Sequence, residues 1–226
     1  MKMIFVCDKC HFLFSRAAEP EQCPDCGKYT VRLADEAEQA EYKERLKEFP
    51  VVKYRDLAVG ELNRELFGSF IRHQIVTKCW RREHGEWLIK DDPFVDDWSE
   101  NDYQILTACL KNTVTTGGFV QGAFVNGLLK GFVSVEPILF GGEQKYLDLS
   151  SIHVSEDLRG AGIGTALFSA AKVWARANGA GKLYISAHSA VETQAFYRNL
   201  GCVEAQVYDS HHVEMEPFDC QLEYVL

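Results

Sequence analysis

The sequence predicts a mixed α/β fold in which a mostly antiparallel sheet is flanked by helices and preceded by a small cysteine-rich module. Three observations support this fold class. Apolar runs with the length and composition of strands are frequent in the second half of the chain. A glycine-rich turn at residues 160–164 joins one such run to a helical pattern. Two closely spaced cysteine pairs lie within residues 1–26.

The N-terminal cysteines predict a metal site. Cys7 and Cys10 form one C-x-x-C pair, and Cys23 and Cys26 form another. In a reducing compartment this spacing favours metal binding over disulfides, and four thiolates can surround Zn²⁺ tetrahedrally as a closed structural site. Iron held by four sulfurs is the alternative. We expect a zinc ribbon over residues 1–33.

A connecting helix is predicted between this module and the main domain. Residues 35–49 are charged, rich in helix formers and without Gly or Pro, and Pro50 ends the pattern. We place the connecting helix at residues 34–50 and the main domain at residues 51–226.

The first part of the main domain is predicted to contain a helix, a hairpin and a second helix. Residues 56–74 carry apolar side chains at helical spacing, and residues 75–90 have the pattern of a hairpin with a His-Gly turn. Ser99 and Asp102 have the spacing of a capping box, which opens the next helix.

Strands dominate the rest of the chain. Asn126–Gly127 is a strong hairpin turn between two apolar runs, and Gly201 is placed to end a helix. The predicted elements are strands at 118–127, 128–140 and 144–155, a helix at 162–178, a strand at 182–188, a helix at 191–201 and two strands in the tail. One βαβ crossover therefore lies within a mostly antiparallel sheet.

The composition limits the classes of partner. The chain has 226 residues, of which 46% are hydrophobic, so it can form one large domain with a small appendage. Its net charge of −9 disfavours nucleic acids and anionic membrane surfaces. Neither an N-terminal leader pattern nor an apolar run of membrane-spanning length is found. We therefore expect a cytoplasmic protein with no nucleic-acid or membrane partner.

The glycine turn predicts an anion site. A P-loop would place a lysine and a hydroxyl after the last glycine, but Thr165 and Ala166 follow Gly164 here. The spacing of Gly160, Gly162 and Gly164 also differs from the dinucleotide fingerprint. Glycines allow close approach of the backbone to a ligand, and the N–H groups of a helix start bind anions. A turn without a ligand would need only one glycine, so we expect a phosphate group here.

Two motifs resemble those of the GNAT superfamily of N-acetyltransferases. The segment "LRGAGIGTALF" is similar to the acetyl-CoA signature of that family, and Arg159, Gly162 and Gly164 match its core positions. The segment "AFYRNLGC" resembles the second motif of the family, in which Tyr197 and Gly201 match. The resemblance extends over roughly residues 60–226.

The sequence departs from the family pattern at two positions. Cys202 replaces the usual aromatic residue after the helix, and Ala190 stands where an asparagine is common. The second change would remove one hydrogen bond to the cofactor.

The resemblance implies an acetyl-CoA site at the glycine turn. In the family fold, pantetheine lies between two diverging strands. Ile152 N–H would face the thioester carbonyl as a single oxyanion donor, and Val154 would face a pantetheine amide. The diphosphate would lie on the turn with Arg159 nearby, at Gly160, Ala161, Gly162, Gly164 and Thr165.

The implied reaction is direct attack of an amine on the acetyl thioester, which needs a base and an acid. Tyr197 matches the family acid, and a phenol of pKa about 10 suits a thiolate leaving group; a packing role in the core is the alternative. Asp148 is the candidate base, because strand alternation places it on the same face as Ile152. Glu136, His153 and a water relay are the rivals.

Two further polar segments are weighed as parts of the site. Residues 91–102 carry six carboxylates, which could receive a cationic amine, but a solvated loop before a capped helix is the preferred interpretation. His211 and His212 are expected in a surface turn.

The leading hypothesis is an acetyl-CoA-dependent N-acetyltransferase with a zinc ribbon. Its acceptor would be an amine of a small molecule or a peptide, and the chain could act as a monomer or a homodimer. The alternative is a CoA-binding regulatory or interaction protein that uses the ribbon to dock a partner. Residues 1–50 hold 8 Lys/Arg against 10 Asp/Glu, which argues against a nucleic-acid-binding ribbon.

Overall fold

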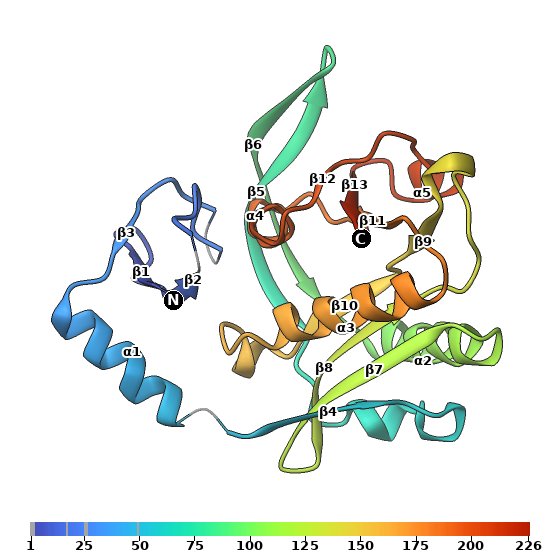
Figure 1. Cartoon of the computed structure of the whole chain (residues 1–226), viewed down its shortest axis with the longest axis horizontal. Coiled ribbons are helices and arrows are strands. Elements are labelled where there is room, and N and C mark those ends of the chain that lie inside the picture. The colour runs from blue at the N-terminus through green and yellow to red at the C-terminus, as the bar shows by residue number, and fades with distance from the viewer. Residues whose placement is uncertain (1–2, 17, 25–26, 49) are drawn as a thin grey trace.

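Two four-stranded sheets form the main domain, and the chain passes from one to the other in the middle (Figure 1). The computed structural model describes residues 3–16, 18–24, 27–48 and 50–226. The first sheet has the strand order β10-β8-β7-β4, with β4 at Val52–Asp56, β7 at Phe119–Val125, β8 at Leu128–Val135 and β10 at Ser151–Val154. The second has the order β12-β13-β11-β9, with β9 at Tyr146–Asp148, β11 at Lys182–Ala187, β12 at Val203–Glu204 and β13 at Cys220–Val225. All pairs are antiparallel except β9 with β11, so the predicted fold class is confirmed.

The change of sheet takes place between β9 and β10. β9 pairs with β11 as far as Asp148 and Tyr184, whereas β10 pairs with β8. The prediction of one strand over residues 144–155 is therefore wrong. Leu149 and Ile152 contact the same core, although alternation in one strand would place residues three apart on opposite faces. The alternation slips by one residue between them, so the prediction that Asp148 shares a face with Ile152 is also wrong.

Helices cover both faces of the first sheet. The helices of the main domain are α2 at Glu100–Thr115, α3 at Ile163–Ala177, α4 at Val191–Leu200 and α5 at Ser210–Met215. Val133 and Val135 of β8 belong to the core under α3, whereas Phe132, which precedes Val133, belongs to the core under α2. This alternation along one strand is what separates the two helix layers. Gly201 has φ +94° and ends α4 as predicted.

A long hairpin arm extends beside α4. β5 at His73–Glu83 pairs with β6 at Glu86–Asp97, which is longer than the predicted hairpin over residues 75–90. The acidic segment is therefore mainly strand and not a loop. Three of its carboxylates pair with cations: Asp91 with Lys78, Asp92 with Arg81 and Asp96 with Arg72. The capping box of Ser99 and Asp102 opens α2 as predicted.

Residues 56–74 do not form the predicted helix. They contain two short 3₁₀ turns, at Val59–Glu61 and Arg64–Phe67. The Asn63 side chain accepts a hydrogen bond from Leu66 N at 3.0 Å, which starts a new turn instead of continuing the first. Short 3₁₀ turns also occur at Gly142–Gln144 and Glu156–Leu158.

The tail contains a helix that was not predicted. Between β12 and β13, where two strands alone were expected, the Asp209 carboxylate caps α5 by accepting the N–H of His212 at 3.1 Å. Pro217 follows this helix. His211 and His212 therefore lie in α5 and not in a surface turn.

The N-terminal module is a small sheet beside the starts of α3 and α4 (Figure 1). Its strands, in the order β2-β1-β3, are β1 at Met3–Cys7, β2 at Leu13–Arg16 and β3 at Val31–Leu33. Helix α1 at Glu36–Glu48 connects it to β4, as predicted. Among the described residues, no helix is both long and apolar enough to cross a membrane.

Candidate active site

The split between β10 and β11 leaves one edge of β10 without a neighbouring strand. Ser155 N donates to Lys130 O of β8 at 2.9 Å. In an antiparallel pair, alternate residues direct their N–H groups to the same neighbour. The N–H groups of Ile152 and Val154 therefore point away from β8, toward the open edge. These are the two N–H groups that the sequence assigns to the thioester and to pantetheine.

The glycine turn lies at the start of α3, next to this edge. Gly160 and Gly162 have φ +81° and +79°, a left-handed conformation that favours glycine. Gly162 is the N-cap of α3, and no described side chain caps the helix there. A Cβ on Gly162 would have no described atom within 4 Å. The first N–H groups of α3 are thus exposed for an anion.

Arg159 and Thr165 flank the turn. The Arg159 guanidinium donates to His73 O at 2.6 Å, which ties the turn to the base of the hairpin arm. Thr165 stands in the first turn of α3, and Gly164 before it lies close to Phe196 of α4. An added Cβ at Gly164 would lie 3.2 Å from the Phe196 ring, so a side chain here would require the ring to shift by a few tenths of an ångström.

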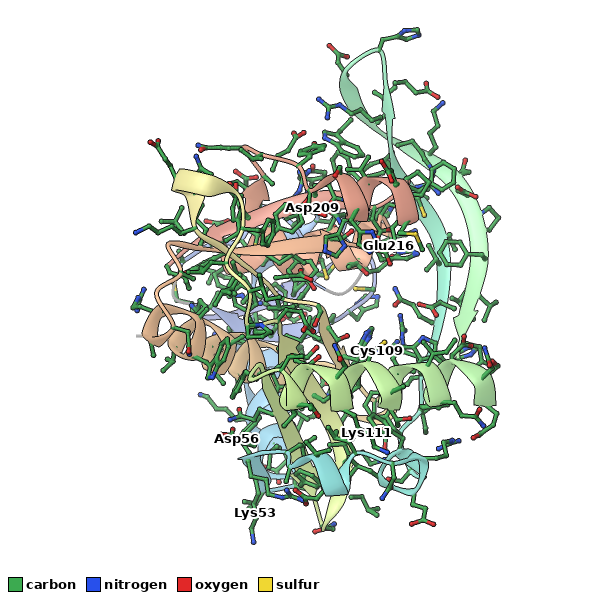
Figure 2. All side chains as sticks on the ribbon, turned by 90° about the vertical axis from the view of Figure 1, so that its right-hand side faces the viewer. Lys53, Asp56, Cys109, Lys111, Asp209 and Glu216 are labelled. Carbon is green, nitrogen blue, oxygen red and sulfur yellow. The ribbon has the colours of Figure 1, made fainter. Side chains whose placement is uncertain are left out.

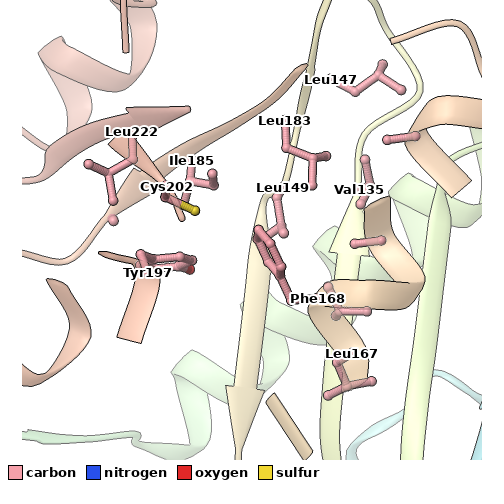
Figure 3. Packing of buried hydrophobic residues seen from close by; sticks show 14 of the residues in the cluster. Val135, Leu147, Leu149, Leu167, Phe168, Leu183, Ile185, Tyr197, Cys202 and Leu222 are labelled. Atoms are coloured by element: carbon pink, nitrogen blue, oxygen red, sulfur yellow. The ribbon is translucent and has the colours of Figure 1, made fainter. Parts of the chain in front are cut away.

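Tyr197 lies in α4 with its side chain buried. Its ring centroid is 6.5 Å from that of Phe168, and Figure 3 shows the side chain directed from α4 toward Leu149. Burial raises the pKa of Tyr197 well above its usual range, and electrostatic interactions with Cys202, Asp219 and Asp148 add to the effect. The phenol is therefore protonated throughout the physiological range and can act as a hydrogen-bond donor.

Asp148 lies at the end of β9, where the two sheets separate. Its side chain is only 14% exposed, and Oδ2 lies 3.2 Å from Nε2 of His212. Oδ1 is buried and has no hydrogen-bond partner among the described residues. A buried carboxylate oxygen without a partner is unfavourable unless another group fills that position. Asp148 is also close enough to Tyr197 for its charge to affect the pKa of the phenol.

His153 is a histidine of the core. Its ring lies 4.8 Å from Trp98 and 5.3 Å from Phe132, between centroids. Burial lowers the pKa of His153 to about 3, and the nearby Arg72 and Arg159 contribute. The side chain is therefore neutral at physiological pH, and its position in an aromatic cluster favours packing over proton transfer.

Glu136 has hydroxyl partners that occupy one of its carboxylate oxygens. Oε1 accepts hydrogen bonds from Thr113 Oγ1 at 2.6 Å and from Ser150 Oγ at 3.0 Å. Its backbone N–H donates to Asp148 O at 2.8 Å, so Glu136 is a direct neighbour of Asp148 in the structure.

The segment around α5 adds acidic groups near Asp148. Burial raises the pKa of Asp219 to about 7, and the neighbouring Glu216 contributes. Figure 2 shows Asp209 and Glu216 on this segment, above Cys109 of α2. His212 and Asp219 were not predicted to lie near Asp148, because α5 is too short and polar to be predicted by periodicity. The Asp209-x-x-His212 spacing of an N-cap is the one local signal that could have found it.

Three cysteine thiols meet in the N-terminal module. The sulfurs of Cys7, Cys10 and Cys23 all lie within 4.8 Å of one another, and those of Cys10 and Cys23 are 3.6 Å apart. The predicted fourth ligand, Cys26, is outside the described residues. Three converging soft ligands fit a zinc or iron ion.

The site therefore combines the open edge of β10 with the uncapped start of α3. The model of the "Acetyltransferase (GNAT) family" matches residues 76–202, more than half of the chain. The chain belongs to this family, and acetyl-CoA is its cosubstrate. This membership supports the enzyme over the regulatory alternative.

Solved structures show the same fold at low identity. Nourseothricin acetyltransferase is 20% identical with a TM-score of 0.54, over 76% of this chain and 95% of the other. A Bacillus anthracis protein assigned as a streptothricin acetyltransferase, solved with acetyl coenzyme A, is 16% identical with a TM-score of 0.57, over 78% and 98%. The PaiA N-acetyltransferase from Thermoplasma acidophilum, solved with coenzyme A, is 13% identical with a TM-score of 0.50, over 78% and 99%. A search of curated proteins found no match.

Proposed function

We propose that the chain acetylates a primary amine by direct attack on acetyl-CoA, with Asp148 as base and Tyr197 as acid. The observation that carries this proposal is the buried Oδ1 of Asp148, which lacks a described partner at the point where the sheets separate. An ammonium group placed there would supply the missing hydrogen bond. The carboxylate and the phenol would then lie on the two sides of the reacting thioester.

The cofactor would lie along the open edge of β10. Ile152 N–H would stabilise the developing oxyanion, and Val154 would hold pantetheine. The diphosphate would bind at the glycine turn, through Gly160, Ala161, Gly162, Gly164 and Thr165 with Arg159 alongside. The outward direction of the β10 N–H groups and the uncapped start of α3 support this placement.

The proposed step conserves protons and charge. Asp148 takes a proton from the ammonium, and the neutral nitrogen forms a bond to the thioester carbon. The C–S bond breaks, the sulfur receives its proton from Tyr197, and the phenol regains a proton from the nitrogen, which becomes the amide N–H. The products are the N-acetyl amine, CoA thiol and one proton, which Asp148 returns to solvent.

The acceptor is proposed to be cationic. Asp148, Asp219 and Glu216 place carboxyl groups around the α5 side of the site. The acids of β6 contribute less than the sequence indicated, because Asp91, Asp92 and Asp96 already pair with cations. Streptothricin is a reasonable first probe, since two proteins of this fold are named for such substrates. Peptide amines are the second group to test.

The N-terminal module is proposed to hold a structural Zn²⁺. Cys7, Cys10 and Cys23 supply three converging sulfurs, and Cys26 would complete the set. A closed four-sulfur site has no open position for substrate, so the ion would stabilise the fold of residues 1–33 and take no part in catalysis. The connecting helix over 34–50 and the acetyltransferase domain over 51–226 complete the proposed organisation. Thiolate ligands fit a reducing compartment such as the cytoplasm.

The proposal is tested by following thiol release from acetyl-CoA with streptothricin, spermidine, L-lysine and a lysine-containing peptide. We expect turnover with at least one of these amines and formation of its N-acetyl product. Asp148→Asn should lower kcat/KM by about a hundredfold or more, since general base catalysis has that magnitude. Glu136→Gln tests Glu136, the rival candidate for the base. A larger loss in Glu136→Gln than in Asp148→Asn would contradict the assignment of the base.

A further inference from the structure

We propose that His212 is the positioning residue for the base: it holds Oδ2 of Asp148 so that Oδ1 faces the acceptor nitrogen. This inference rests on the proposed function and adds a residue that comes from the tail of the chain. His212 itself would not touch the substrate. Its action would be to fix the direction of one carboxylate oxygen.

The geometry of the pair supports different roles for the two carboxylate oxygens of Asp148. Nε2 of His212 lies 3.2 Å from Oδ2 of Asp148, and the two side chains are 24% and 14% exposed. The second oxygen, Oδ1, is buried without a hydrogen-bond partner among the described residues. A carboxylate fixed at one oxygen has little rotational freedom left at the other. The unpaired oxygen is therefore held in one place before the amine arrives.

Tyr184 fixes α5 relative to Asp148. Tyr184 is the strand partner of Asp148 in the parallel pair of β9 and β11. Its hydroxyl accepts a hydrogen bond from the N–H of Asp209, the N-cap of α5, at 2.9 Å. Its ring also lies 5.7 Å from the ring of His212. Tyr184 thus helps to position both Asp148 and His212, so the contact between them does not depend on α5 alone.

The charges around His212 favour its protonated form. The hydrogen bond to Asp148 raises the pKa of His212, and Asp148, Asp209 and Glu216 add negative charge. Asp219 interacts electrostatically with the same imidazole, and the rings of Tyr184 and His211 lie 5.7 and 6.2 Å from it, between centroids. A protonated His212 donates its Nε2–H to Oδ2 of Asp148, and this charge-assisted hydrogen bond holds the carboxylate in one direction.

The experiment compares His212→Ala, His212→Gln and His211→Ala in the full chain, using the amine that the wild type acetylates. We expect His212→Ala to lower kcat by about 10- to 100-fold, because a misplaced reacting group has that effect. KM for acetyl-CoA should change little.

His212→Gln and His211→Ala are the matched variants. Glutamine can donate a hydrogen bond to Oδ2 without a charge, so it should restore most of kcat. His211 is the exposed neighbour in α5, and His211→Ala should leave kcat unchanged. If His212 had a purely structural role, His212→Ala would lower stability and His212→Gln would not restore kcat.

A second measurement keeps the inference testable without turnover. The imidazole pKa of His212, followed by NMR, should fall in Asp148→Asn, because the hydrogen bond to the carboxylate raises this pKa in the wild type. An unchanged pKa would show that the pair does not form in solution and would overturn the inference. So would a His212→Ala variant with wild-type kcat. Absence of turnover by the wild type with every amine would instead count against the proposed function.

Discussion

The Tyr197 side chain is well placed to donate a hydrogen bond but poorly suited to lose its proton. A free phenol has a pKa of about 10 and a thiol about 8.5, and burial moves the phenol further from the thiol. Complete transfer to a thiolate is therefore uphill. The structure favours a phenol that stabilises charge on sulfur in the transition state and transfers its proton only as another replaces it.

Tyr197→Phe tests this role by removing one hydroxyl while keeping the ring. We expect kcat to fall by about a hundredfold, with acetyl-CoA affinity nearly unchanged, because the interaction is made mainly in the transition state. Tyr103→Phe is the control. Tyr103 is also 6% exposed, but its hydroxyl donates to Phe70 O at 2.9 Å. Its loss should reduce stability by about 1 kcal/mol without affecting kcat. A Tyr197→Phe enzyme within about threefold of the wild type would assign the residue to the core.

Helix caps and turns that depend on neighbouring residues were predictable from the sequence. Elements that depend on contacts with residues far away in the sequence were not. The capping box at Ser99, the turn at Asn126 and the C-cap at Gly201 depend on nearby residues, and all three are confirmed. The one-residue shift in side-chain alternation between β9 and β10 arises because β9 pairs with β11 and β10 pairs with β8. No local sequence pattern predicts this change of partner. Helix α5 depends on its contact with Tyr184, far away in the sequence. The position of His212 beside Asp148 could not be predicted for the same reason, because the two residues lie 64 positions apart in the sequence.

The glycine turn gives a prediction at the level of an element. Gly162→Val should abolish acetyl-CoA binding, because a side chain would cover the N–H groups at the start of α3. Gly127→Val is the matched control. Gly127 has φ +81°, close to the +79° of Gly162, and a Cβ would meet no described atom within 4 Å at either position. Both variants should therefore lose about 1–2 kcal/mol of stability to backbone strain, and only Gly162→Val should lose the ligand. Calorimetry that finds wild-type affinity in folded Gly162→Val would refute the site.

At the scale of the whole molecule, the N-terminal module contacts the two helices that bear the site. A Cβ on Gly160 of the glycine turn would lie 2.7 Å from the Phe12 ring, and one on Gly27 would lie 2.3 Å from Val191 at the start of α4. The module therefore packs directly against the backbone of the turn and the first residue of α4. Since α4 also carries Tyr197, the state of the module can affect both the cofactor turn and the acid.

Metal removal tests this connection. The main domain has its own core around Leu167 and Phe168, so we expect it to stay folded when a chelator removes the metal. The loop between Cys10 and Leu13, which carries Phe12, should become more mobile, and the turn at Gly160 should lose its contact with the Phe12 ring. Affinity for CoA should then fall by about fivefold, which corresponds to roughly 1 kcal/mol for ordering the turn on binding. Metal analysis, circular dichroism and calorimetry with CoA measure the three effects separately.

Two variants separate the metal from the contact. Phe12→Ala should reproduce the loss of CoA affinity while the metal stays bound, because the ring is what touches Gly160. Tyr29→Ala, at an aromatic residue of the same module that is 64% exposed, should change neither property. If metal-free protein and Phe12→Ala both bind CoA as the wild type does, the module does not support the turn. If instead the main domain unfolds without metal, its core is not sufficient by itself and the boundary at residue 51 is wrong.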